Sequence, residues 1–378
     1  MKSQKILIVA TQGCVGGAQR VVADLARAYA ARGIEVVVGF GDGDHAFLSA
    51  TLADAHIPTI IFPTLQRTMN PLTNLRFAFA LRRFLNEHSF DVIHFHSSNA
   101  LFGAIGAKLA RSRPKTVFTF HGLSFLDPQH RTNIFMRFAY WIVFKKLLWF
   151  VDMPVFVTAA DLHYAQRIHL TARGVVIPNG ITPPHFLPRT DARDALAQKI
   201  GATITSDQLI IGSIGRLAYP KNYEFLIQQF PALLAAQPNL IGIIIGDGPE
   251  RARHQALIDT LGLQRHFFLV GAIHDAARYL PAFDIFALPS LYEGQSITLL
   301  EATAASLPIV ASAVAGTKET LADAGLIYPI DDASLFTDAV NKLLNDASFR
   351  TRLGARAKER SQQFSLAKMV ENYIRVYN

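Results

Sequence analysis

The chain alternates short apolar, often β-branched runs with amphipathic stretches that are long enough to form helices. In the first half, the predicted strands are Lys5–Ala10, Ile34–Gly39, Thr59–Phe62, Val92–Phe95, Thr116–Phe120, Met153–Val157 and Gly174–Ile177. The helices predicted between them include Ala18–Arg32, Leu72–His88, Ala100–Arg111, Asn133–Trp149 and Ala160–His169. Strands that are apolar along their whole length are typical of a parallel sheet covered by helices on both faces. The pattern therefore predicts an α/β fold.

The alternation restarts in the second half of the chain. The strands predicted there are Leu209–Ser213, Ile241–Ile245, Phe267–Val270, Ile285–Leu288, Ile309–Ala311 and Gly325–Tyr328. The segment from Ile181 to about Asp207 separates the two halves, and we expect a linker there because it contains Pro183, Pro184 and Pro188.

A restarted pattern after a linker predicts two Rossmann-like, doubly wound parallel-sheet domains that face a cleft. We expect the first domain over residues 1–182 and the second over residues 183–365. The final stretch, residues 366–378, has the pattern of an amphipathic helix over Leu366–Val376.

Charge is unevenly distributed along the 378 residues. The net charge is +8, and residues 1–182 alone hold 19 Lys and Arg against 10 Asp and Glu. A basic half favours an anionic partner. Since we find no nucleic-acid-binding motif, we expect a phosphate-bearing substrate or an acidic membrane surface.

Two features bear on localisation. No run approaches the roughly 20 apolar residues that span a bilayer, and the single cysteine, Cys14, fits a reducing compartment. We expect a cytoplasmic protein, or one that is peripheral on the inner face of the cytoplasmic membrane.

Two glutamates lie eight residues apart in LPSLYEGQSITLLEATAASLPIVAS. We expect Glu293 in a loop after the strand Ile285–Leu288, and Glu301 about two turns into the following helix. Carboxylates at the carboxyl end of a parallel sheet lie where open α/β sheets bind ligands. Glu293 would bind sugar hydroxyls and Glu301 a ribose diol; the alternative is a surface loop glutamate and a helix-face glutamate.

A second group of residues is suited to binding phosphate. In GSIGRLAYPKN, Arg216 and Lys221 lie between a strand and a helix that starts near Asn222. Helix N-termini and cations both stabilise anions, although a pair of exposed cations on a turn would have the same sequence. In GDGPER, Gly246 permits a tight turn close to a ligand, or simply a structural turn.

Two motifs are expected at the strand ends of the first domain. TQGCVGGAQR places Gly16 and Gly17 at a helix start, where they form either an anion or sugar platform or a packing turn. It is not a dinucleotide-binding fingerprint. His121 ends a strand and is followed by Gly122, so we expect it to face the ligand side rather than to be purely structural.

Three further segments carry less specific signals. In Ala315-Gly316-Thr317, Gly316 would allow a ligand to approach and Thr317 would cap the next helix. Asp42-Gly43-Asp44 imitates a metal motif, but we interpret it as a solvated turn. The aromatic, cationic stretch Asn133–Trp149 is predicted to be either an interfacial membrane helix or a buried core helix.

These strings, in this order, resemble the retaining family 4 glycosyltransferases. Glu293 and Glu301 match the Glu-x7-Glu signature, and the loop with Arg216 and Lys221 matches Gly-Arg-Leu-x(3)-Lys-Asn. GGAQR resembles the family's Gly-Gly-Ala-Glu-Arg, with Gln19 in place of the usual Glu.

The resemblance implies the GT-B fold, with an acceptor-binding first domain and a second domain that binds a nucleoside diphosphate sugar, with UDP as the expected nucleotide. Arg216 and Lys221 would hold the diphosphate, Glu301 the ribose and Glu293 the donor sugar. His121 and the Gly16-Gly17 loop would complete the donor site.

The resemblance also implies a glycan or lipid-linked acceptor in cell-envelope or exopolysaccharide biosynthesis. No cofactor and no metal are expected, because the two cations can neutralise the leaving group. Donor selectivity would depend on residues beside the first glutamate, namely Gly294, Gln295, Ser296 and Thr298. Two alternatives are a non-hydrolysing sugar-nucleotide epimerase of the same fold and a non-catalytic nucleotide-sugar-binding protein.

Overall fold

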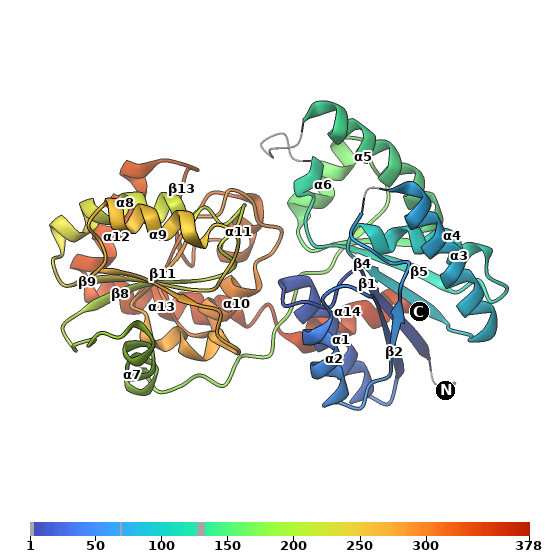
Figure 1. Cartoon of the computed structure of the whole chain (residues 1–378), viewed down its shortest axis with the longest axis horizontal. Helices are drawn as coiled ribbons and strands as arrows, with labels where there is room; N and C mark the ends of the chain where they lie inside the picture. Colours follow the sequence, from blue (N-terminus) through green and yellow to red (C-terminus); the bar gives the residue numbers. More distant parts are fainter. Residues whose placement is uncertain (1–3, 69, 127–132) are drawn as a thin grey trace. The chain divides into compact units, whose positions relative to one another are not determined.

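The computed structural model describes residues 4–68, 70–126 and 133–378, and it divides into two compact units (Figure 1). Unit 1 comprises the chain up to Gly180 together with Leu366–Asn378, and unit 2 comprises Ile181–Ser365. Every strand predicted from the sequence is present, with ends shifted by at most two residues. Each unit contains one sheet in which all strand pairs are parallel, so the predicted doubly wound α/β architecture is confirmed.

The sheet of unit 1 has the strand order β3-β2-β1-β4-β5-β6-β7. Its strands are β1 Lys5–Ala10, β2 Glu35–Gly41, β3 Thr59–Phe62, β4 Val92–His96, β5 Lys115–Phe120, β6 Met153–Phe156 and β7 Val175–Val176. Its α-helices are α1 Gly17–Ala30, α2 Ala46–Ala53, α3 Pro71–Glu87, α4 Gly103–Leu109, α5 Ile134–Leu147, α6 Ala159–Arg167 and α14 Leu366–Tyr377. Helix α2 is absent from the sequence-based prediction.

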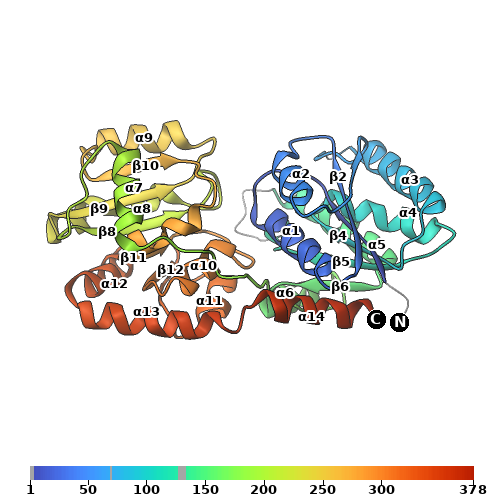
Figure 2. The ribbon, with the colours of Figure 1, turned by 90° about the horizontal axis from the view of Figure 1, so that it is seen from below.

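The C-terminal helix α14 belongs to unit 1 and lies beside α1 (Figure 2). Its buried side chains include Met369, Val370, Tyr373 and Tyr377, which recur at helical spacing on one face. This periodicity is the reason that the sequence predicts the helix correctly.

The sheet of unit 2 has the strand order β10-β9-β8-β11-β12-β13. Its strands are β8 Leu209–Ile214, β9 Leu240–Ile245, β10 Phe267–Gly271, β11 Ile285–Leu288, β12 Ile309–Ser312 and β13 Leu326–Tyr328. Its α-helices are α7 Arg189–Ile200, α8 Tyr223–Ala236, α9 Arg251–Thr260, α10 Ile297–Ala304, α11 Ala315–Leu321, α12 Ala333–Asn345 and α13 Ala347–Ser361.

Two apolar cores cover the two faces of this second sheet, because successive strand residues point to opposite faces. On β11, Ile285 and Ala287 join the core formed with α8 and α12. Phe286 and Leu288 join the core formed with α7 and α10. This double burial accounts for the continuous apolar run of the strand.

Helix α7 lies inside the segment predicted to be a linker, so the linker prediction is wrong for these residues. Ala192 and Leu196 lie one turn apart on α7 and are completely buried against the sheet. Pro188 stands immediately before the helix, and proline is well tolerated at a helix start. The prolines therefore mark the boundary between the units, but the segment that follows them is helical.

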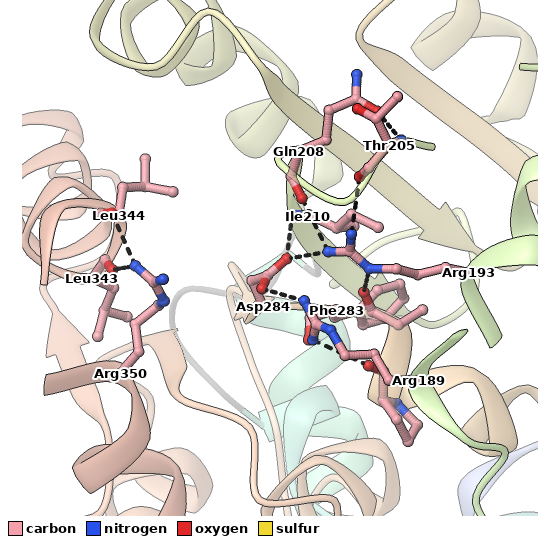
Figure 3. A network of polar contacts seen from close by, with 12 residues as sticks. Arg189, Arg193, Thr205, Gln208, Ile210, Phe283, Asp284, Leu343, Leu344 and Arg350 are labelled. Carbon is pink, nitrogen blue, oxygen red and sulfur yellow. Dashed lines mark hydrogen bonds and ion pairs between the residues drawn. The ribbon is translucent and has the colours of Figure 1, made fainter. Parts of the chain in front are cut away.

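An ion-pair network fastens α7 to the sheet of unit 2 (Figure 3). Asp284, directly before β11, accepts hydrogen bonds from Arg193 at 2.8 Å and from Arg189 at 2.6 Å. Arg193 is buried, and its guanidinium also donates to the carbonyl groups of Thr205 and Gln208. A buried guanidinium with several acceptors fixes the position of the helix more specifically than apolar contact alone.

Each sheet has one point where the strand order reverses. In unit 1 it lies between β1 and β4, and in unit 2 between β8 and β11. Loops at the carboxyl ends of the strands around such a point form the ligand-binding edge of open α/β sheets. The residues predicted to form a site are found in the loops that follow the strands or in the first turns of the helices after them.

Candidate active site

The loop between β8 and α8 carries the two predicted cations. Arg216 is exposed, whereas the side chain of Lys221 is only 19% exposed. The backbone N–H of Leu291 donates to the Pro220 carbonyl at 2.8 Å, which joins this loop to the loop that follows β11. Both loops therefore line the strand-order reversal of unit 2.

Lys221 and Glu293 form one ion pair at this point. Lys221 Nζ donates to Glu293 Oε1 at 2.7 Å, and Ser290 Oγ donates to the same oxygen at 2.6 Å. Ser312, at the end of β12, donates in turn to the Ser290 carbonyl. The sequence predicted separate ligands for the two charged residues; the structure shows that each positions the other, and it adds Ser290, which the sequence did not indicate.

The electrostatics of this pair favour the charged lysine. Burial alone would lower the pKa of Lys221, but the Glu293 carboxylate, together with Tyr223, raises it above the usual value. The lysine is therefore an ammonium throughout the neutral range. The loop therefore presents two cations: the Lys221 ammonium, which is paired with Glu293, and the Arg216 guanidinium.

Glu301 lies on α10 and is almost completely buried. The helix begins at Ile297 because the side chain of Ser296 accepts a hydrogen bond from the Leu299 N–H. Glu301 is therefore just over one turn into the helix, and the predicted two turns are wrong. The difference places its carboxylate nearer to the helix start.

The residues predicted to select the donor surround this helix start. Gln295 and Ser296 are buried, and the hydroxyl groups of Ser296 and Thr298 are 3.0 Å apart. Ser296 therefore has a structural role as the helix cap, in addition to any contact with a ligand.

Gly316 brings the first turn of α11 against the loop that carries Glu293. A Cβ atom added at Gly316 would overlap the Gly294 carbonyl oxygen and lie 2.7 Å from the Glu293 carbonyl oxygen. Only glycine permits this contact. Thr317 is inside the helix, which begins at Ala315, so the prediction that it caps the helix is wrong.

Gly246 has the corresponding role after β9. Its φ is +153°, and an added Cβ would overlap the Gly215 carbonyl oxygen in the loop that carries Arg216. Gly248 similarly approaches the Leu217 carbonyl group. The glycines of GDGPER therefore let the loop after β9 pack on the cation loop, which identifies a structural requirement for them.

In unit 1, Gly16 and Gly17 lie at the start of α1, as predicted. Gln19 points back toward its own loop, where its side-chain amide donates to the Gln12 carbonyl at 3.2 Å. The residue that departs from the family string therefore stabilises the loop itself.

His121 follows β5, and its ring contacts a second histidine. His121 Nε2 lies 2.8 Å from Nδ1 of His96, the last residue of β4. Burial lowers the pKa of His121 to about 4, so the ring is neutral at physiological pH. Sequence reasoning missed His96; the available signal was the alternation of His94 and His96 in a strand that is otherwise apolar.

The remaining predictions concern surface segments of unit 1. Asp42, Gly43 and Asp44 lie in a bend after β2, and no group of three potential metal-ligating side chains occurs among the described residues. On α5, only Phe144 and Leu147 are buried, whereas Ile134, Phe135 and Phe138 are at least 60% exposed. The prediction of a buried core helix is therefore wrong for most of α5.

Comparison with known proteins decides the family. A model of the Glycosyltransferase Family 4 matches residues 15–183, and a model of the Glycosyl transferases group 1 matches residues 197–360. Together they match most of both units and include every predicted site residue. The chain is a family 4 glycosyltransferase.

Relatives and solved structures agree with this assignment. The UDP-Gal:alpha-D-GlcNAc-diphosphoundecaprenol alpha-1,3-galactosyltransferase of Escherichia coli is 24% identical over 304 residues, which cover 78% of this chain and 76% of that protein. The phosphatidyl-myo-inositol mannosyltransferase of Mycolicibacterium smegmatis is 29% identical over 308 residues, with 79% and 73% covered. The crystal structure of Anabaena Alr3699/HepE in complex with UDP and glucose superimposes with a TM-score of 0.83 at 23% identity and covers 99% of each chain.

Proposed function

We propose that this glycosyltransferase moves a hexose from a UDP-sugar to a lipid-linked or glycan acceptor with retention of anomeric configuration. The observation that carries the proposal is the Lys221–Glu293 ion pair, which is held by Ser290 at the strand-order reversal of unit 2. Two relatives support the choice of substrates. Anabaena Alr3699/HepE forms a complex with UDP and glucose, and the Escherichia coli galactosyltransferase is named for UDP-Gal and a diphosphoundecaprenol acceptor.

The chemistry requires stabilisation of a leaving diphosphate. The bond between the anomeric carbon and the phosphate oxygen breaks, and the acceptor oxygen bonds to that carbon on the same face. The acceptor proton passes to the leaving phosphate. Arg216 and the ammonium of Lys221 stabilise the negative charge that develops, and the fixed position of Lys221 means that little reorganisation is needed.

The other residues of unit 2 have complementary roles in this proposal. Glu301 accepts hydrogen bonds from the ribose hydroxyl groups, and Glu293 accepts one from the donor sugar while it holds Lys221. Because two protein cations neutralise the diphosphate, we propose that transfer needs no metal ion.

Unit 1 is proposed to bind the acceptor and to contribute His121 and the Gly16-Gly17 loop to the donor site. A neutral imidazole and backbone N–H groups form hydrogen bonds with hydroxyl groups without introducing charge. This suits the uncharged hydroxyls of a sugar.

The test is a screen of nucleoside diphosphate sugars with a polyprenyl diphosphate sugar as acceptor. We expect free UDP and a glycosylated lipid to appear in equal amounts. An epimerase would interconvert the donor without net UDP release, and a binding protein would leave it unchanged. Either result would contradict the proposal.

We also propose that unit 1 contacts an anionic membrane surface. Helix α5 exposes Ile134, Phe135 and Phe138 to solvent, and it carries Lys145 and Lys146 in its last turn. Apolar side chains beside cations are typical of interfacial helices. Among the described residues, no helix combines the length and apolar character needed to cross a bilayer, so contact would occur at the surface.

A basic depression formed by α3 and by Arg111, which follows α4, also supports contact of unit 1 with an anionic membrane. It has a volume of about 390 Å³ and is lined by Phe79, Arg82, Arg83, Asn86, Glu87 and Arg111. Phe79 is 57% exposed at its edge. Its lining contains three guanidinium groups and one carboxylate, so it is positively charged and suited to binding a lipid phosphate.

Vesicle sedimentation tests this contact. We expect the protein to sediment with phosphatidylcholine–phosphatidylglycerol vesicles at low salt and much less with phosphatidylcholine alone. Phe135→Ser combined with Phe138→Ser should weaken sedimentation, whereas Leu335→Ser, at an exposed leucine of unit 2, should not. Equal sedimentation of all variants would contradict the assignment of α5.

A further inference from the structure

Unit 1 contains a buried polar network that the proposed reaction does not use directly. His94 Nδ1 lies 2.7 Å from the Tyr377 hydroxyl, and His94 Nε2 lies 2.7 Å from Thr119 Oγ1. Tyr377 contacts the Tyr29 hydroxyl at 3.0 Å, and Thr119 contacts the Tyr373 hydroxyl at 2.9 Å. Helix α14 thus supplies two of the five side chains.

The network fixes the protonation state of His94. All five side chains are at most 1% exposed, apart from Tyr377 at 3%, so unpaired polar atoms would be costly. A neutral His94 that accepts from Tyr377 and donates through Nε2–H to Thr119 satisfies both ring nitrogens. Burial also lowers the pKa of His94 well below its usual value.

His96 is the next residue on the same face of β4. Its ring lies 4.0 Å from the His94 ring, between centroids, and 5.1 Å from the His121 ring. Their strand neighbours Ile93 and Phe95 point into the opposite core, so both histidines lie on the face of the sheet from which α14 contacts His94. The orientation of His94, set by the tyrosines, therefore limits the positions open to His96.

The contact between His96 Nδ1 and His121 Nε2 can hold only one proton. If His121 donated it, the remaining N–H of His96 would be on Nε2, which is buried and has no partner among the described residues. Buried N–H groups without acceptors are rare. If His96 Nδ1–H instead donates to His121 Nε2, the N–H of His96 has an acceptor. The proton of His121 then lies on Nδ1.

We propose that His96 is a positioning residue that donates to His121 Nε2 and thereby holds the His121 ring in one orientation and in the Nδ1–H tautomer. The inference rests on the proposed function, in which His121 Nδ1–H donates to a hydroxyl of the bound sugar. A fixed tautomer keeps that donor available in every turnover.

Two substitutions separate hydrogen bonding from packing. Asn places its amide nitrogen where His96 has Nδ1, so His96→Asn retains the donor, whereas His96→Leu fills the space without it. We expect His96→Leu to lower kcat about 10- to 100-fold, on the scale of a misoriented group near the reacting atoms, and His96→Asn to retain most of the wild-type kcat. UDP-induced thermal stabilisation, which reports on unit 2, should be unchanged in both. His163→Leu, at an exposed histidine, is the control.

Ring ¹⁵N NMR of His121 provides a readout that does not depend on turnover. We expect one tautomer in the wild type and in His96→Asn, and a mixture in His96→Leu. If the wild type shows no transferase activity, these spectra still test whether His96 fixes the tautomer of His121. Unchanged His121 spectra in His96→Leu, or equal loss of kcat in both variants, would overturn the proposal. If His96→Leu does not fold, His96→Gln, whose amide lies where Nε2 was, replaces it with the same expectations.

Discussion

The two units are built on the same kind of parallel sheet, yet the side chains at their strand-order reversals differ in chemistry. In unit 2 the loops present the acidic and basic side chains of Arg216, Lys221 and Glu293, with Lys221 and Glu293 in an ion pair. In unit 1 the corresponding edge presents the neutral imidazoles of His96 and His121. The fold therefore determines where a site lies, and the loop residues determine which ligand chemistry it serves.

The units also differ in how the polar groups are held. Lys221 and Glu293 lie on loops and depend on each other and on Ser290. His94 lies on a strand and is hydrogen-bonded by Tyr377 of α14, and His96 packs against the His94 ring. The polar groups of unit 2 are therefore held by charge balance, and those of unit 1 are held by contacts between buried side chains.

Removing a charged residue of unit 2 should have the largest effect on turnover, and it tests this contrast most strongly. Lys221→Ala should reduce kcat/KM at least 100-fold, because it removes a fixed cation and leaves Glu293 unpaired. Steady-state kinetics measures this, with circular dichroism to verify folding. Lys199→Ala, at an exposed lysine of the same unit, should have no effect. A folded Lys221→Ala enzyme with wild-type kinetics would remove the charged centre from the mechanism.

The next largest effect should come from a change in backbone packing in unit 2. Gly316→Ala should weaken UDP binding and lower the transition temperature of unit 2, because its Cβ would displace the Gly294 carbonyl oxygen. Gly43→Ala in unit 1, where the nearest atom is a side-chain nitrogen at 3.6 Å, is the control. If Gly316→Ala binds UDP as tightly as the wild type, the close contact is not required by the site.

Lowering the pH should destabilise the protein mainly through unit 1. The folded-state pKa of His121 is lowered from 6.5 to about 4, so its contribution to the free energy of unfolding is complete above pH 6.5 and is lost as the pH falls toward 4. Thermal melts across this range should therefore show a larger loss of stability for the wild type than for His121→Asn. Equal losses for the two proteins would contradict the assignment of a neutral, half-buried His121 with a lowered pKa.

The smallest expected effect concerns metal ions. Because Arg216 and Lys221 supply the positive charge, chelation with EDTA should leave transfer rates unchanged. If activity falls and Mg²⁺ or Mn²⁺ restores it, protein cations alone do not neutralise the diphosphate, and the comparison between the units must include a metal.

The strands and the loop positions of the site were predictable from the sequence because they depend on local patterns. Continuous apolar runs indicated each parallel strand, and Arg216, Lys221 and Glu293 were found in the predicted loops. Helix α7 was missed because prolines dominated the expectation, although Ala192 and Leu196 already had helical spacing. The ends of short helices were also misjudged, which moved Glu301 by a turn.

Interactions between distant segments could not be predicted in this way. His96 contacts His121 from a neighbouring strand, and the tyrosines that fix His94 come from the far end of the chain. Ser290 could be identified only once the loop around Glu293 was folded. A single sequence carries no record of such pairings, since each residue alone is compatible with many environments.

Ligand-induced thermal stabilisation tests the central claim, that the charged edge of unit 2 binds the nucleoside diphosphate of the donor. We would compare UDP with GDP and ADP on the wild type, Glu301→Ala and the exposed control Glu359→Ala. A ligand at about 100 times its Kd should stabilise the protein by roughly 2.7 kcal/mol. We predict a shift with UDP that is retained in Glu359→Ala and lost in Glu301→Ala. No shift with any of the three nucleotides, or an equal shift in Glu301→Ala, would contradict the claim.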